Sequence, residues 1–179
     1  MTLLYHREEL EIPEPEGSEA KEVFAFFGLC SYSAQVLERG LVNLAVALRA
    51  LGLTRLTKED FDSSFEKMEK KTLGQLIADV RPYVNVSAEL EQAIVAALHD
   101  RKYITHAFFA NHDINFMSDS GRIKMMDELR QITQRIRNVD RELELITHSL
   151  WQRLGLTEEI FQNGLKEMEA EAKQLDKSS

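Results

Sequence analysis

Arg101 and His106 are the residues of this sequence whose types and spacing could do chemistry together. They stand five positions apart in the segment Arg101-Lys-Tyr-Ile-Thr-His106. An imidazole titrates near neutral pH, so it can accept and return a proton. A guanidinium stays charged and offers a fork of donors that fits a phosphate group. The pair could therefore activate a hydroxyl group and neutralise the phosphate that the hydroxyl attacks.

Arg101 also occupies an unusual place on its own predicted helix. At about 100° per residue, it falls in the middle of an apolar face. That face comprises Ala97, Leu98, Ile104 and Phe108. Because an unpaired buried charge costs several kcal/mol, we expect Arg101 to be largely buried beside a carboxylate, a ligand phosphate or a water-filled cleft. Glu38 is the first candidate, since it borders the apolar seam of an early helix; the alternative is an arginine that reaches the surface of a less buried helix.

The geometry of one helix does not bring the two groups together. Five positions correspond to a rotation of about 140° and a rise of roughly 7.5 Å on an ideal helix. The length of the Arg101 side chain, or a second copy of the chain, would have to bring the guanidinium and the His106 imidazole into the same cleft. This spacing is one reason to expect a homodimer.

The segment from Arg101 to His106, on a late helix of an all-helical chain, resembles the signature of HEPN domains. In that family an arginine and a histidine are separated by four to six residues. The flanking sequences add to the likeness: Phe108 and Phe109 follow the histidine, and the early helix contains Gln35-Val-Leu-Glu38. This layout is similar to that of bacterial HEPN-like proteins of defence and toxin-antitoxin systems.

The resemblance implies metal-independent RNA cleavage at a dimer interface. His106 would be the general base or acid for attack by the RNA 2′-hydroxyl, and Arg101 would neutralise the scissile phosphate. Lys102 and Glu38 would then belong to the substrate-binding site. Lys102 departs from the family, since HEPN ribonucleases usually have Asn, Asp or His after the arginine. HEPN domains also include non-catalytic modules that bind partner proteins or nucleotides.

The charge balance keeps a second class of function open. The 179 residues include 22 Lys and Arg against 30 Asp and Glu, a net charge of −8 with His neutral. This charge opposes non-specific nucleic-acid binding, which needs broad positive potential. Arg130 and Arg137 share a helix face and could bind phosphate locally, but interleaved acidic residues also fit a solvated face. The alternative function is a non-catalytic interaction or adaptor protein, acting as a neutralising partner or regulator through protein–protein contacts.

Other classes of site find little support in the sequence. The spacing of His99, His106 and His112 fits no metal-ligand pattern, so we expect neither a metal nor a cofactor. Cys30, the one cysteine, excludes an intramolecular disulfide framework. No apolar run approaches the roughly 18 residues of a membrane span, and charges occupy the place of a signal peptide's apolar stretch. We therefore expect a cytoplasmic protein that is not inserted in a membrane.

Helices must position all of these residues. Leu, Ala, Glu and Lys are abundant and prolines are few, which favours an all-α fold. Apolar residues recur in steps of three and four along residues 18–52 and 122–154, which predicts two long helices. Shorter helices are expected to begin near Thr57, Thr72, Ser87 and Thr157.

The seams of the two long helices are narrow, which predicts shallow packing angles. We predict a helical bundle with the long helices antiparallel and the shorter ones flanking them. The predicted organisation is an arm over residues 1–17, a single domain over 18–175 and a frayed tail over 176–179. Residues 113–121 are expected to form a loop, and the surplus aromatics from Phe24 to Phe27 could hold the arm or a second subunit.

Overall fold

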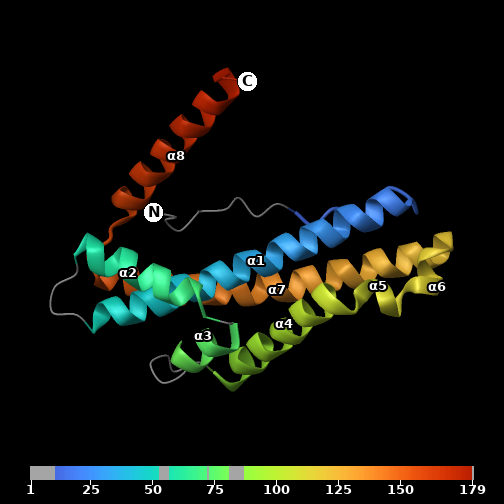
Figure 1. The fold of residues 1–179 in the computed structure, drawn as a ribbon, viewed down its shortest axis with the longest axis horizontal. Helices are drawn as coiled ribbons and strands as arrows, with labels where there is room; N and C mark the ends of the chain where they lie inside the picture. The colour runs from blue at the N-terminus through green and yellow to red at the C-terminus, as the bar shows by residue number, and fades with distance from the viewer. Residues whose placement is uncertain (1–10, 53–56, 72, 81–86, 179) are drawn as a thin grey trace.

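The described part of the chain is built from α-helices and contains no strand. The computed structural model describes residues 11–52, 57–71, 73–80 and 87–178. The eight helices there are α1 (Ala20–Leu51), α2 (Lys58–Glu69), α3 (Leu73–Val80), α4 (Ala88–His106), α5 (Phe108–Asn111), α6 (Asp113–Phe116), α7 (Asp119–Arg153) and α8 (Glu158–Ser178) (Figure 1). The predicted all-α helical bundle is confirmed. No helix among these residues is both long and apolar enough to cross a membrane.

The core lies between α1 and α7, which pack side by side over most of their length (Figure 1). The steps of three and four in the sequence place one apolar stripe on each helix. The central part of each stripe is buried. Its large side chains include Leu37, Leu41 and Leu44 from α1 and Leu129, Ile132, Ile136 and Leu143 from α7. The two predicted long helices are therefore the two halves of one core.

The long helices are parallel, so the antiparallel arrangement predicted above is wrong. The Nε atom of Arg137 donates to Ser33 Oγ at 3.4 Å, and a Cβ built on Gly40 would lie 2.8 Å from Asp140 Oδ1. The residue numbers of contacting positions therefore increase together along α1 and α7, as they do in a parallel pair. The reason is α4, which runs back along the pair and returns the chain to the end where α1 began (Figure 1). One intervening helix that spans the bundle makes the two outer helices parallel.

The short helices begin at polar residues. Thr57 caps α2 through a capping box: the Asp60 amide donates to Thr57 Oγ1, and the Thr57 amide donates to the Asp60 carboxylate, each at 3.2 Å. Ser87 Oγ accepts from the Leu90 amide at the start of α4. The cap predicted at Thr72 lies outside the described residues.

The segment predicted as a loop is helical instead. α4 ends at His106, and two one-turn helices, α5 and α6, lead into α7. Phe108 is buried here among the rings of Phe27, Tyr103, Phe109 and His112. α4 ends just before this buried ring and does not continue through it. α7 begins three residues earlier than predicted.

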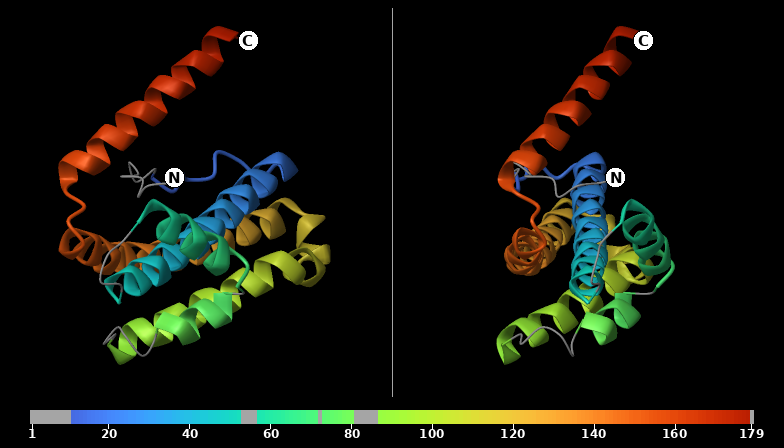
Figure 2. Two further views of the ribbon diagram at one scale, coloured as in Figure 1. Left: turned by 60° about the vertical axis from the view of Figure 1, so that its left-hand side comes forward. Right: turned by 90° about the vertical axis from the view of Figure 1, so that its left-hand side faces the viewer.

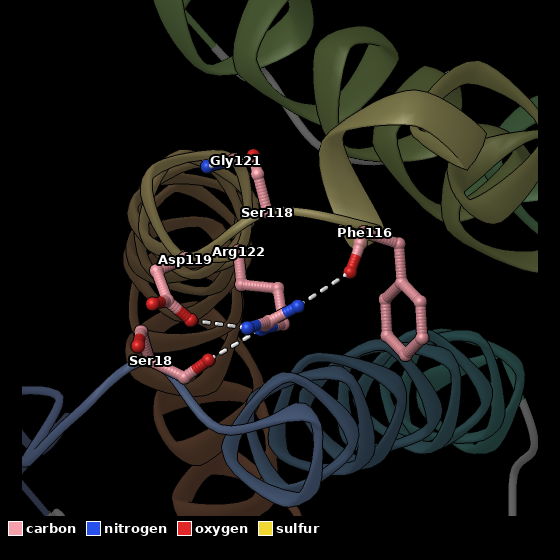
Figure 3. A network of polar contacts seen from close by, with 6 residues as sticks. All are labelled: Ser18, Phe116, Ser118, Asp119, Gly121 and Arg122. Carbon is pink, nitrogen blue, oxygen red and sulfur yellow. Dashed lines mark hydrogen bonds and ion pairs between the residues drawn. The ribbon is translucent and has the colours of Figure 1, made fainter.

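Arginines of α7 hold the N-terminal arm. Arg130 Nε donates to the carbonyl of Pro13 at 3.1 Å, and the same guanidinium pairs with Glu14. Arg122 reaches the carbonyl of Ser18, the carbonyl of Phe116 at 2.8 Å and the carboxylate of Asp119 (Figure 3). The described part of the arm therefore lies along α7 of its own chain.

α8 leaves the bundle. Figure 2 shows it projecting from the body beyond the turn at Gly155, whose φ of 84° suits a glycine. Phe161, in its first turn, is buried, and its ring lies 5.8 Å from that of His148. The helix then continues to Ser178, through most of the tail predicted to fray. The bundle itself is thus formed by α1–α7.

Candidate functional site

Arg101 forms the predicted ion pair with Glu38. Its Nη2 atom lies 2.6 Å from Glu38 Oε1, which links α4 to α1. The pair is half-exposed, with 39% of the Arg101 side chain and 30% of the Glu38 side chain accessible to solvent. The expectation that Arg101 is largely buried is therefore wrong. Ala97 and Ile104 fill the core beneath it, and the long arginine side chain carries its charge past them to the edge of α4.

The residue before Arg101 makes a second clamp in a different direction. Asp100 accepts two hydrogen bonds from Arg135 of α7, from Nε at 2.9 Å and from Nη2 at 3.1 Å. Asp100 and Arg101 thus tie α4 to α7 and to α1, respectively. Sequence spacing carries no signal for this contact, because Asp100 and Arg135 lie on different helices.

His106 and Lys102 take part in neither of these two ion pairs. Both are exposed, and His106 is the last residue of α4. The His106 side chain makes no hydrogen bond or ion pair with any other residue that the structure describes. The structure therefore joins Arg101 to Glu38 and leaves His106 open to solvent.

Arg130 and Arg137, the two arginines that could bind phosphate locally, make contacts within the chain, and so does Arg135. Arg130 holds the arm, Arg135 holds α4, and Arg137 contacts Ser33 of α1. These contacts are made within the chain and involve no ligand. They connect α7 to its neighbours in the bundle.

A polar cluster around His112 was missed by the sequence analysis. The buried His112 contacts Glu128 Oε2 through Nε2 at 2.8 Å and Asn115 Nδ2 through Nδ1 at 2.9 Å. Tyr103 Oη lies 3.2 Å from the same Nε2 atom. Because both ring nitrogens are occupied, the cluster ties α6 to α7 and leaves no nitrogen for proton transfer with a ligand. No motif marks it, since its members come from three helices.

We expect the Tyr103 hydroxyl to make stability fall at alkaline pH. Burial, followed by the hydrogen bond to Glu128, raises the pKa of Tyr103 from 10.0 to about 12. The unfolded chain therefore binds fewer protons than the native chain in this window, so the free energy of unfolding falls as pH rises from about 10 to about 12. Urea titrations over this range should show a smaller loss in Tyr103→Phe than in the wild type. An equal loss in both proteins would contradict this linkage.

Cys30 behaves as a core residue. Burial raises the pKa of its thiol to about 11, so little thiolate is present near neutral pH. Within the described ranges, no three His, Cys, Asp or Glu side chains gather closely enough to hold a metal ion. The candidate site therefore consists of Arg101 with Glu38, the exposed Lys102 and the exposed His106.

The Arg101–Glu38 pair is expected to stabilise the fold only weakly. Exposed ion pairs typically contribute about 0.2–1 kcal/mol, because solvent screens them and ordering both side chains costs entropy. A double-mutant cycle of Arg101→Ala and Glu38→Ala, measured by urea unfolding, should give a coupling energy in that range. A coupling energy of about 3 kcal/mol would contradict this expectation and would indicate the buried ion pair that the sequence predicted.

Comparison with known proteins adds no relative. No family model matches the chain, and no curated protein or solved structure shows significant similarity to it. The function must therefore be inferred from the geometry of the chain itself.

Proposed function

We propose that this chain is a non-catalytic helical interaction protein, in which the bundle α1–α7 presents α8 to a partner protein. The observation that carries the proposal is the projection of α8 from the body (Figure 2). A helix that the chain extends into solvent with an apolar stripe gains most of its stability by packing against something else. The engagement of Arg101 by Glu38 supports a structural role for that arginine.

The apolar residues of α8 support this function. Leu165 and Met168 are half-buried on α8, yet they are not among the side chains that pack against the core. The neighbouring Leu154 and Leu156, by contrast, do pack against it. The core thus ends near the first turn of α8, and the stripe beyond it is available to another molecule.

Photo-crosslinking in the producing cell tests the proposal. A photoreactive amino acid at Met168 should yield an adduct heavier than the 20.6 kDa chain. The same group at Gln35, an exposed position on α1, is the matched control and should yield none. Absence of an adduct from position 168, or equal adducts from both positions, would contradict a function centred on α8.

Metal-independent RNA cleavage is the second candidate, favoured by the exposure of His106 and of part of the Arg101 side chain. Here His106 is the acid or base, Arg101 neutralises the phosphate, and Lys102 and Glu38 complete the binding site. The candidate needs a homodimer, since one helix does not bring Arg101 and His106 together. An exposed apolar group at the end of the bundle could bury itself against a second copy; it comprises Phe24, Phe109, Ile114 and Met117.

Cleavage assays in chelator separate the two candidates. Wild type should cleave structured or single-stranded RNA, and His106→Ala should stay folded and lose the activity. Light scattering should give twice the chain mass at micromolar concentration. No cleavage by the wild type, or equal cleavage by wild type and His106→Ala, would leave the interaction function alone.

A further inference from the structure

The apolar stripe of α8 has the spacing of a coiled-coil seam. Its members recur in steps of four, three, four and three residues along the helix. They are Phe161, Leu165, Met168, Ala172 and Leu175. This is the alternation of a and d positions in a heptad repeat, which packs one helix against another at a shallow angle. The face that α8 presents is therefore shaped for a second helix.

The seam becomes more exposed with distance from the bundle. Phe161 is buried at the base, Leu165 and Met168 are half-buried, and 70% of Leu175 is exposed at the far end. Within the described residues, α8 makes no extensive contact with any other helix. The two views in Figure 2 agree that the helix stands away from the body. The part of the seam beyond Phe161 is thus accessible to an incoming helix.

The charges that flank this seam are acidic. With Phe161 at a d position, Glu169 occupies an e position and Glu171 a g position, one on each side of the seam. Lys166 and Lys173 occupy b positions, one step farther round the helix. Charges at e and g face the partner helix and decide which partner is accepted. Both borders of the distal seam therefore present carboxylates to the incoming helix.

These charges argue against a second copy of α8 as the occupant. In an antiparallel pair, e faces e and g faces g, so Glu169 and Glu171 would each meet a like charge. In a parallel pair, the g position at Gly164 faces Glu169 and offers it no cation. The net charge of −8 adds to the repulsion between two copies.

We infer that α8 binds an amphipathic helix of a partner protein, and that lysine or arginine flanks the apolar seam of that helix. This inference rests on the proposed function. Leu165 and Met168 supply the apolar contact, and Glu169 and Glu171 supply the selectivity. The same carboxylates disfavour the anionic surface of a membrane, which a basic amphipathic helix would prefer.

The binding of two synthetic helical peptides to the full chain tests which flanking charges α8 prefers in a partner. Both carry the same leucine heptads, and one has lysine at every e and g position where the other has glutamate. Fluorescence anisotropy should show that the lysine peptide binds at least about tenfold more tightly than the glutamate peptide. Raising the salt from about 0.05 to 0.5 M should weaken this preference, since salt screens exposed charges.

Three variants separate the seam from its charges. Leu165→Asp/Met168→Asp should lose binding of the lysine peptide by at least about tenfold. Glu169→Lys/Glu171→Lys should reverse the preference toward the glutamate peptide. Leu145→Asp alters an exposed leucine of α7 that is not part of the seam, and this variant should bind as the wild type does. Thermal unfolding of each variant checks that the bundle is intact.

Four results would overturn the inference. They are no binding of the lysine peptide by the wild type, binding that survives the change of Leu165 and Met168, a dimer in light scattering that this change dissolves, and seam-dependent binding to phosphatidylglycerol vesicles. A crosslink from Met168 in cells to a protein other than a second copy of the chain would still uphold the proposed function in each of these cases. Failure of the partner chemistry and failure of the function are therefore distinguishable.

Discussion

Phe108→Ala is expected to lower the free energy of unfolding by about 3–5 kcal/mol, the largest loss that we predict. Phe108 is 1% exposed, and its ring centroid lies 4.7 Å from that of His112 and 5.3 Å from that of Phe109. Removing this ring opens a cavity at the junction of α4, α5 and α1. Urea unfolding, with an unchanged dependence on denaturant, measures the loss.

The adjacent phenylalanine is the matched control. Phe109 is 36% exposed, although its ring packs on those of Phe24, Phe27, Phe108 and Phe116. Because less of its surface is buried, Phe109→Ala should cost about 1 kcal/mol. Equal losses from the two substitutions would mean that α4 does not end at His106 and continues as a regular helix.

Gly121→Ala is expected to cost about 3 kcal/mol for a different reason, overpacking against the backbone. A Cβ at Gly121, in the first turn of α7, would lie 2.1 Å from the carbonyl oxygen of Asn115 and 2.6 Å from its Cα. Neither atom belongs to a flexible side chain, so α6 would have to shift. Chemical denaturation of the variant should give a lower midpoint, with native helix content retained in circular dichroism.

Gly28→Ala should have the opposite sign. Gly28 is exposed within α1, and a Cβ built there meets nothing within 4 Å, so an added methyl group has room. Alanine in an exposed helix interior is more favourable than glycine by about 0.8–1 kcal/mol. A Gly121→Ala variant as stable as Gly28→Ala would show that α6 does not pack on the start of α7.

The sequence predicts the helices because their apolar periodicity is a local property. Steps of three and four locate α1 and α7 within a few residues, and polar caps at Thr57 and Ser87 locate two shorter helices. The direction of α7 relative to α1 is not local. It depends on whether the connecting helices return along the bundle, and no single segment encodes that.

The sequence likewise predicts the local features of the candidate site and misses the contacts between distant segments. The pairing of Arg101 with Glu38 followed from a charge placed on an apolar face, which a helical projection reveals. The burial of Arg101 was overestimated, because a projection locates the Cβ and not the guanidinium at the end of the side chain. The contacts of Asp100 with Arg135 and of His112 with Glu128 join distant segments, so only the folded chain reveals them.

The parallel pairing of α1 and α7 also shapes how the chain can fold. Contacting residues in this interface, such as Ser33 and Arg137, are 104 positions apart in the sequence. Interfaces of such high contact order form slowly, because a long loop must close before any of its contacts can stabilise the chain. On the ribosome, the apolar stripe of α1 emerges well before α7 exists to cover it. The nascent protein therefore carries the face of α1 that packs on α7 without its partner until α7 is made, and an apolar face that is left uncovered promotes aggregation.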